Sequence, residues 1–158
     1  MKSIVIYSSQ TGNTKKLAEA VYSALSGEKS IYPIGEAPEP SGFDLVCVGF
    51  WLMAGKPDPK SQEYLKKITS QKLFLFATHG ASATSRHVQN AMEEAIRLAP
   101  ESDIIGSFSC SGEVNPKVIE KAGSKPEPPA WLDDAPKAVG HPDQADLKNV
   151  IRRLEESL

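Results

Sequence analysis

Small polar residues gather near the start of the chain, in the stretch SSQTGNT at 8–14. Their hydroxyl and backbone N–H groups are neutral hydrogen-bond donors, and the single glycine permits a backbone geometry that side chains disfavour. At the start of a helix such donors point toward one spot, where the helix dipole also favours negative charge. The stretch therefore predicts a phosphate-binding site that needs no Arg or Lys. Its candidate residues are Ser9, Gln10, Thr11, Gly12, Asn13 and Thr14.

The residues on either side of this stretch predict a strand before it and a helix after it. Residues 2–7 are mostly apolar and β-branched, as in a buried strand. Apolar residues then recur at helical spacing, at Leu17, Ala18, Val21 and Leu25. An ordinary helix N-cap is the alternative interpretation, because Ser, Thr and Asn all cap helices well.

Two common phosphate-binding loops do not fit the stretch. The nucleoside-triphosphatase loop requires G-x-x-x-x-G-K-S/T, whereas this loop has one glycine and no Lys followed by Ser or Thr. The dinucleotide loop requires G-x-G-x-x-G, and two of its three glycines are missing here. The pattern present from Ser9 to Thr14 is Ser/Thr-x-Thr-Gly-x-Thr, and it resembles the FMN-phosphate loop of the flavodoxin family.

Apolar runs alternate with amphipathic stretches along the rest of the chain. Strands are expected at 2–7, 29–34, 43–50, 72–78 and 103–109, and helices at 15–25, 61–70, 86–99, 115–122 and 144–156. Such alternation predicts a doubly wound α/β fold. We expect a five-stranded parallel sheet in the order 2-1-3-4-5, with helices on both faces. Residues 1–158 should form a single flavodoxin-like domain, in which the Pro-rich part 123–143 is an extended surface segment.

Ligands of such sheets bind outside the carboxyl ends of the strands, where four loops should meet: 8–14, 51–58, 78–85 and 109–113. The second loop opens with large apolar residues, which would cover a flat isoalloxazine ring. The alternative is that Trp51 packs the following helix onto the sheet. Gly55 could turn a carbonyl toward the ring, although turn chemistry also explains it. The candidate ring-binding residues are Trp51, Leu52, Met53, Gly55, Thr78, His79, Gly80 and Ala81.

The third of these loops departs from the family pattern. Relatives commonly carry an aromatic residue there, often Tyr, but residues 81–85 include none. His79 could hydrogen-bond a ring carbonyl or bring positive charge toward the ring, and the alternative is a histidine that only braces the loop. His87 and His141 are expected to be structural or exposed.

Composition excludes several classes of protein. The chain has 158 residues, a net charge of −2 and 40% hydrophobic residues, as expected of a globular domain with a sizeable core. It has no basic block that would bind nucleic acid and no apolar run near the ~20 residues of a membrane span. No signal region precedes the first strand, so a cytoplasmic location is expected. Cys47 is expected in the core, Cys110 lies near a strand end, and their spacing fits neither a disulfide framework nor a metal site.

The resemblance implies an FMN protein from a divergent, short-chain branch of the flavodoxin-like proteins. It would carry electrons between redox partner proteins through transient contacts, as a monomer or weak dimer. Paired carboxylates and a nucleophile–base pair are missing from the sequence pattern, so no catalytic residue and no metal ligand is predicted. One alternative is an NAD(P)H-dependent FMN reductase or quinone-type oxidoreductase, and another is a cofactor-free interaction module with this fold. Of these three hypotheses, the electron carrier is favoured.

Overall fold

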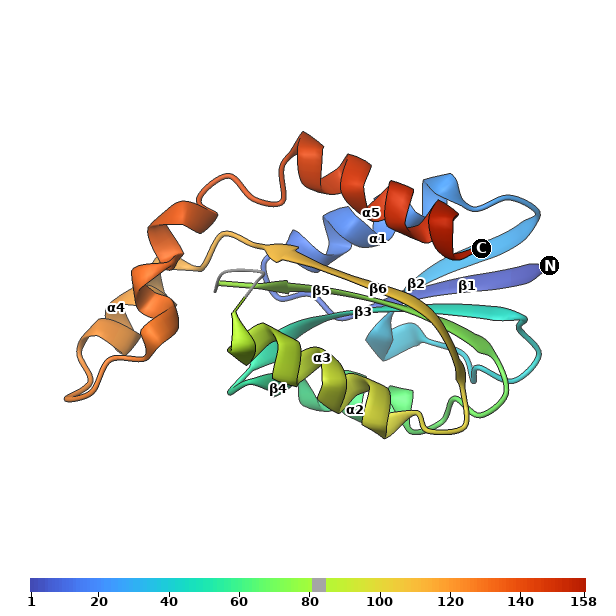
Figure 1. Ribbon diagram of the computed structural model, residues 1–158, viewed down its shortest axis with the longest axis horizontal. Coiled ribbons are helices and arrows are strands. Elements are labelled where there is room, and N and C mark those ends of the chain that lie inside the picture. The colour runs from blue at the N-terminus through green and yellow to red at the C-terminus, as the bar shows by residue number, and fades with distance from the viewer. Residues whose placement is uncertain (81–84) are drawn as a thin grey trace.

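The computed structural model describes residues 1–80 and 85–158, which are arranged around a twisted parallel sheet (Figure 1). Its five long strands are β1 (Lys2–Tyr7), β2 (Glu28–Pro33), β3 (Leu45–Met53), β5 (Lys72–His79) and β6 (Asp103–Ser111). They lie in the order β2-β1-β3-β5-β6, and every neighbouring pair is parallel. Counted along the chain, these strands have the order 2-1-3-4-5, so the predicted doubly wound fold is confirmed.

Helices cover both faces of the sheet. On one face lie α1 (Asn13–Ala24) and α5 (Gln144–Ser157), and on the other lie α2 (Pro59–Leu65) and α3 (Arg86–Leu98) (Figure 1). Short 3-10 helices occupy Ile34–Glu36, Ala130–Asp133 and Ala135–Ala138. The helix α4 (Pro116–Gly123) projects beyond the sheet together with the last two of these. Among the described residues, no helix combines the length and apolar character that a bilayer crossing requires.

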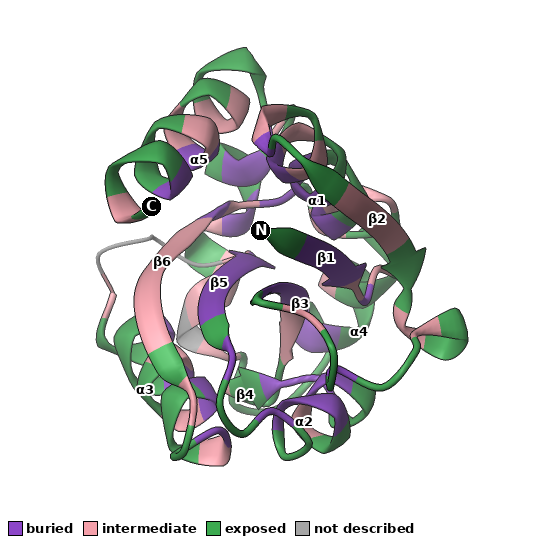
Figure 2. Cartoon of the chain, turned by 90° about the vertical axis from the view of Figure 1, so that its right-hand side faces the viewer, coloured by how far each residue is buried: buried purple, intermediate pink, exposed green. Residues whose placement is uncertain are grey.

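The central strands alternate their side chains between two apolar cores. Ile4 and Ile6 pack in the core under α2 and α3, whereas Val5 packs in the core under α1 and α5. Figure 2 shows that the inner strand β5 is mostly buried, whereas the edge strand β6 is half-buried. Covering on both faces explains why these strands are apolar at most positions in the sequence. Cys47 lies in the core as predicted, and Cys110 is buried as well.

The prediction of a loop at 51–58 is wrong for its first three residues. Residues 51–53 continue the strand, and the chain then folds back into a hairpin with the two-residue strand β4 (Lys56–Pro57). Ala54 and Gly55 form the turn with φ values of 53° and 77°. Two consecutive residues with positive φ suit the twist of a tight hairpin, so the glycine that indicated a loop marks a turn between strands.

Two other predicted elements also differ from the structure. The helix expected at 61–70 is α2, which begins earlier because Asp58 caps it and Pro59 suits a first helical position. It ends at Leu65, although Ile68 is buried as a helix through that position would require. The Pro-rich part 123–143 is not simply extended, because it contains two 3-10 helices, the second with Pro136 in its first turn.

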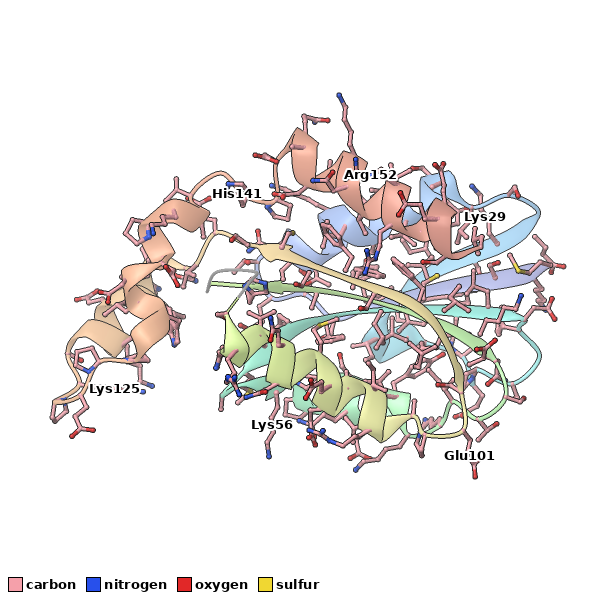
Figure 3. The ribbon with its side chains drawn as sticks, in the orientation of Figure 1. Lys29, Lys56, Glu101, Lys125, His141 and Arg152 are labelled. Atoms are coloured by element: carbon pink, nitrogen blue, oxygen red, sulfur yellow. The ribbon has the colours of Figure 1, made fainter. Side chains whose placement is uncertain are left out.

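His141 lies near the end of the Pro-rich part, shortly before α5, and its side chain joins the cap of that helix (Figure 3). Asp143 and Asp146 form a capping box, and Nδ1 of His141 is 2.6 Å from Oδ2 of Asp146. Ligand-type atoms of the three residues lie within 4.8 Å of one another, a grouping that sequence spacing did not indicate. The hydrogen bonds of the helix cap already account for the closeness of these three residues.

The hydrogen bond to Asp146 raises the pKa of His141 above its usual value. This stabilisation is present below the unfolded-state pKa of histidine and is lost as the pH rises through the folded-state pKa. We therefore expect His141→Gln to lower the urea midpoint more at about pH 5.5 than at about pH 9. A backbone hydrogen bond lowers the pKa of Asp143, so the stabilisation from this carboxylate is lost only at more acidic pH, as the pH falls through its folded-state pKa. Exposed His87, changed to Gln, is the control, and an equal loss at both pH values would contradict the prediction.

Candidate functional site

A cavity of about 560 Å³ opens at the carboxyl ends of β1, β3, β5 and β6. This volume is within the range of small-molecule sites. The predicted residues that line it are Ser9, Gln10, Thr11, Asn13, Thr14, Trp51, Leu52, Met53, Gly55, Thr78, His79 and Gly80. Gly12, which directly precedes α1, is not among the lining residues, and Ala81 lies outside the described residues. A second hollow of about 640 Å³ on β6, between α3 and α5, includes none of the predicted residues.

The N-terminus of α1 faces this cavity without a side-chain cap. Gly12 precedes the helix in the left-handed region, with φ of 93°, and the described residues supply no capping side chain. By contrast, Asp58, Ser85, Asn115 and Asp143 cap the other four α-helices. Because the first N–H groups of a helix need acceptors from outside it, this end of α1 suits an anion.

Hydrogen bonds hold the loop before α1 in shape. The backbone N–H of Gly12 donates to Oγ of Ser9 at 3.0 Å. The buried hydroxyls of Thr14 and Thr78 are 2.9 Å apart, which fastens the start of α1 to β5. The side-chain amide of Asn13 donates to the carbonyl of Glu113 at 2.9 Å. These side chains therefore join three of the expected loops, while the exposed Thr11 lines the cavity.

Asp58 ends the loop expected at the site, and it is a buried carboxylate that sequence reasoning did not name as a site residue. It accepts hydrogen bonds from the hydroxyls of Ser8 (2.7 Å) and Ser61 (2.9 Å). It also accepts from the backbone N–H groups of Ser61 (3.3 Å) and Trp51 (3.4 Å). Asp58 thus joins the loop after β1 to the hairpin and to α2. The available signal was Asp-Pro at the start of a helical pattern, which is typical of an N-cap.

The hairpin forms an apolar wall of the cavity. Trp51 and Leu52 are half-buried there, and Met53 at the tip is 50% exposed. His87, in the first turn of α3, is exposed as predicted, but it also lines the cavity beside this hairpin. The ring of His87 lies close to the hairpin turn, because a Cβ atom added to Gly55 would be 3.1 Å from Cε1 of His87.

Another wall comes from β6 and the segment after it. The loop after β6, expected at the site, contributes Gly112 and Glu113. Other lining residues belong to α4, its flanks and the Pro-rich part, and these were not predicted: Val114, Asn115, Val118, Lys125, Pro129 and Trp131. Figure 3 shows Lys125 on the part of the chain that projects beyond the sheet. The one signal in the sequence was an isolated Trp-Leu pair among prolines.

Comparison with known proteins agrees with this architecture. A family model described as a flavodoxin domain matches residues 4–154. A flavodoxin-like domain-containing protein, BilS, of Clostridioides difficile is 36% identical over 119 residues, which cover 72% of this chain and 68% of that protein. BilS of Clostridium symbiosum is 27% identical over 173 residues, covering 93% of this chain and 90% of that protein.

Solved structures with the same fold are more distant in sequence. The flavodoxin of Streptococcus pneumoniae superposes with a TM-score of 0.62 at 10% identity, and the match covers 100% of both chains. A flavoprotein of Lactobacillus acidophilus, solved in complex with FMN, has a TM-score of 0.53 at 17% identity, covering 68% of this chain and 92% of that one. The family match, the strand order and the cavity at the strand ends agree, and this chain belongs to the flavodoxin domain family.

Proposed function

We propose that this protein binds FMN in the cavity at the strand ends and carries electrons between redox partner proteins. The observation that carries the proposal is that the uncapped N-terminus of α1 and the apolar hairpin line one cavity. A phosphate needs the first feature and a flat aromatic ring needs the second. The flavoprotein of Lactobacillus acidophilus, which shares the fold, is described as a complex with FMN.

The residues at the start of α1 fit a phosphate. The backbone N–H groups that follow Gly12 have no side-chain acceptor in the described structure, and the helix dipole favours an anion there. Thr11 and Ser9 add hydroxyl groups to the same part of the lining. These donors would hold a phosphate without a salt bridge.

The remaining lining fits an isoalloxazine ring. Trp51 and Leu52 provide apolar surface from the hairpin, and exclusion of water by such surface strengthens polar contacts inside the site. His79, buried at the end of β5, would hydrogen-bond a ring carbonyl. When bound, FMN supplies the redox chemistry, because it accepts and donates electrons singly or in pairs.

Exposure of the cavity rim favours a carrier that exchanges electrons with a docked protein. Met53 is 50% exposed and Val118 is 46% exposed, and both line the cavity. Apolar side chains at the mouth of a site suit a transient protein contact. An NAD(P)H-dependent reductase would need room for a nicotinamide near residues 81–85, of which 81–84 lie outside the described residues.

Spectroscopy of the purified protein tests the proposal. We expect visible flavin absorption, or its appearance on titration of the apoprotein with FMN, and tighter binding of FMN than of riboflavin because only FMN has the phosphate. Anaerobic NAD(P)H should reduce the flavin slowly unless a flavoprotein reductase is added. Rapid reduction by NAD(P)H alone would indicate an oxidoreductase, and a protein that binds no flavin would indicate an interaction module.

A further inference from the structure

Residues 116–138 build a small lobe beside the sheet. The helix α4 contacts the 3-10 helix Ala130–Asp133, which in turn contacts the 3-10 helix Ala135–Ala138. Ala122, Ala135 and Ala138 are buried inside this arrangement. Figure 1 shows the lobe projecting past the carboxyl ends of the strands, where the cavity opens.

Two contacts fasten the lobe to the sheet next to the cavity. At its base, the backbone N–H of Glu113 donates to the carbonyl of His141 at 2.8 Å, which brings the two ends of the lobe together. Trp131 rests near the end of β5. A Cβ atom on Gly80 would lie 3.5 Å from Cε3 of Trp131 and 2.6 Å from Cγ2 of Val114, so only a glycine at this position admits both side chains.

The side of the lobe that lines the cavity is apolar except for Lys125. Val118, Pro129 and Trp131 form its apolar part, and they share the cavity with Trp51 and Leu52 of the hairpin. The chain has two tryptophans, Trp51 and Trp131, and both of them line this cavity. Exposed apolar surface on two separate elements around one hollow is typical of a site that receives an apolar ligand.

We infer that Trp131 covers the face of the isoalloxazine ring that is turned away from the hairpin, so that the lobe is one wall of the flavin site. The inference rests on the proposed binding of FMN. A flat ring has two apolar faces, and aromatic cover in an offset or edge-to-face arrangement stabilises each of them. Residues 81–85, which follow β5, include no aromatic side chain, whereas Trp131 lies beside Gly80 at the end of that strand.

The test compares the affinities of two ligands for variants of the lobe. Trp131→Ala should weaken the binding of FMN and of riboflavin by the same factor, about tenfold, because both ligands have the ring. Trp131→Phe keeps an aromatic face and should restore binding to within about threefold of the wild type. Val139→Ala is the matched control, because Val139 is 63% exposed, follows the lobe directly and does not line the cavity.

Hydrogen exchange separates ring contact from a structural role. Riboflavin should slow the exchange of amides in residues 116–138 of the wild type and should have little effect on them in Trp131→Ala. Wild-type affinity of Trp131→Ala for both ligands would overturn the inference. A drop in the melting temperature of the apoprotein together with failure of Trp131→Phe to restore affinity would also overturn it. Wild-type protein that binds neither ligand would instead contradict the proposed function.

Discussion

Replacing Thr11 with alanine should raise the dissociation constant for FMN by about 10- to 150-fold and leave that for riboflavin almost unchanged. Thr11 lines the cavity next to the uncapped end of α1, and its exposed hydroxyl can donate to a phosphate oxygen. A hydrogen bond to a charged group contributes about 1.5–3 kcal/mol, which gives the expected range. Titration of the apoprotein, followed by quenching of flavin fluorescence, measures both constants.

Two further variants complete this comparison. Thr11→Ser keeps the hydroxyl and should bind FMN nearly as well as the wild type does. Thr69→Ala removes a hydroxyl from an exposed threonine that is not part of the cavity lining, and it should change neither constant. Equal weakening of FMN and riboflavin by Thr11→Ala would mean that the hydroxyl contacts the ring or shapes the loop, and that the phosphate lies elsewhere.

Replacing Asp58 with alanine should lower the free energy of unfolding of the apoprotein by at least about 3 kcal/mol. The variant removes the N-cap of α2 and leaves the buried hydroxyls of Ser8 and Ser61 without their acceptor. Losing a cap costs about 1 kcal/mol, and each buried polar group without a partner costs about 1–3 kcal/mol. Urea denaturation of the apoprotein measures the change.

Asp58→Ala should also weaken the binding of FMN, because Asp58 joins the loop after β1 to the hairpin. Glu63→Ala is the control on the same helix, since its ion pair with Lys66 is exposed and contributes little. Unchanged unfolding energy would show that the cluster of hydrogen bonds is replaced by water. Lost stability with unchanged affinity for FMN would show that the cluster supports the fold but does not shape the site.

Features that depend on neighbours in the sequence could be predicted. The strand order follows from alternating strands and helices, because crossovers in such sheets have one hand. The loop before α1 could also be located, since its residues adjoin one another and directly precede a helix. Thr14 and Asn13 line the cavity, but their partners Thr78 and Glu113 are 64 and 100 residues away, so no local pattern indicated those hydrogen bonds.

The hairpin and the lobe were missed for physical reasons that differ. At Ala54-Gly55 the sequence indicated a break in regular structure, but a hairpin turn and an irregular loop use the same residue types. In the lobe, the density of prolines predicted an extended segment, but Pro129 precedes one 3-10 helix and Pro136 lies in the first turn of the next. The role of Trp131 in the lining depends on Gly80 and Val114, which come from distant parts of the chain and meet it only in the folded protein.

The placement of both tryptophans around one cavity gives the protein an optical property of its own. Tryptophan fluorescence of this chain comes only from indoles that border this cavity. A molecule that fills the cavity and contacts both walls would therefore lie beside every indole of the chain. Unlabelled protein can report its own occupancy, and single substitutions at Trp51 or Trp131 would show from which wall each part of the signal comes.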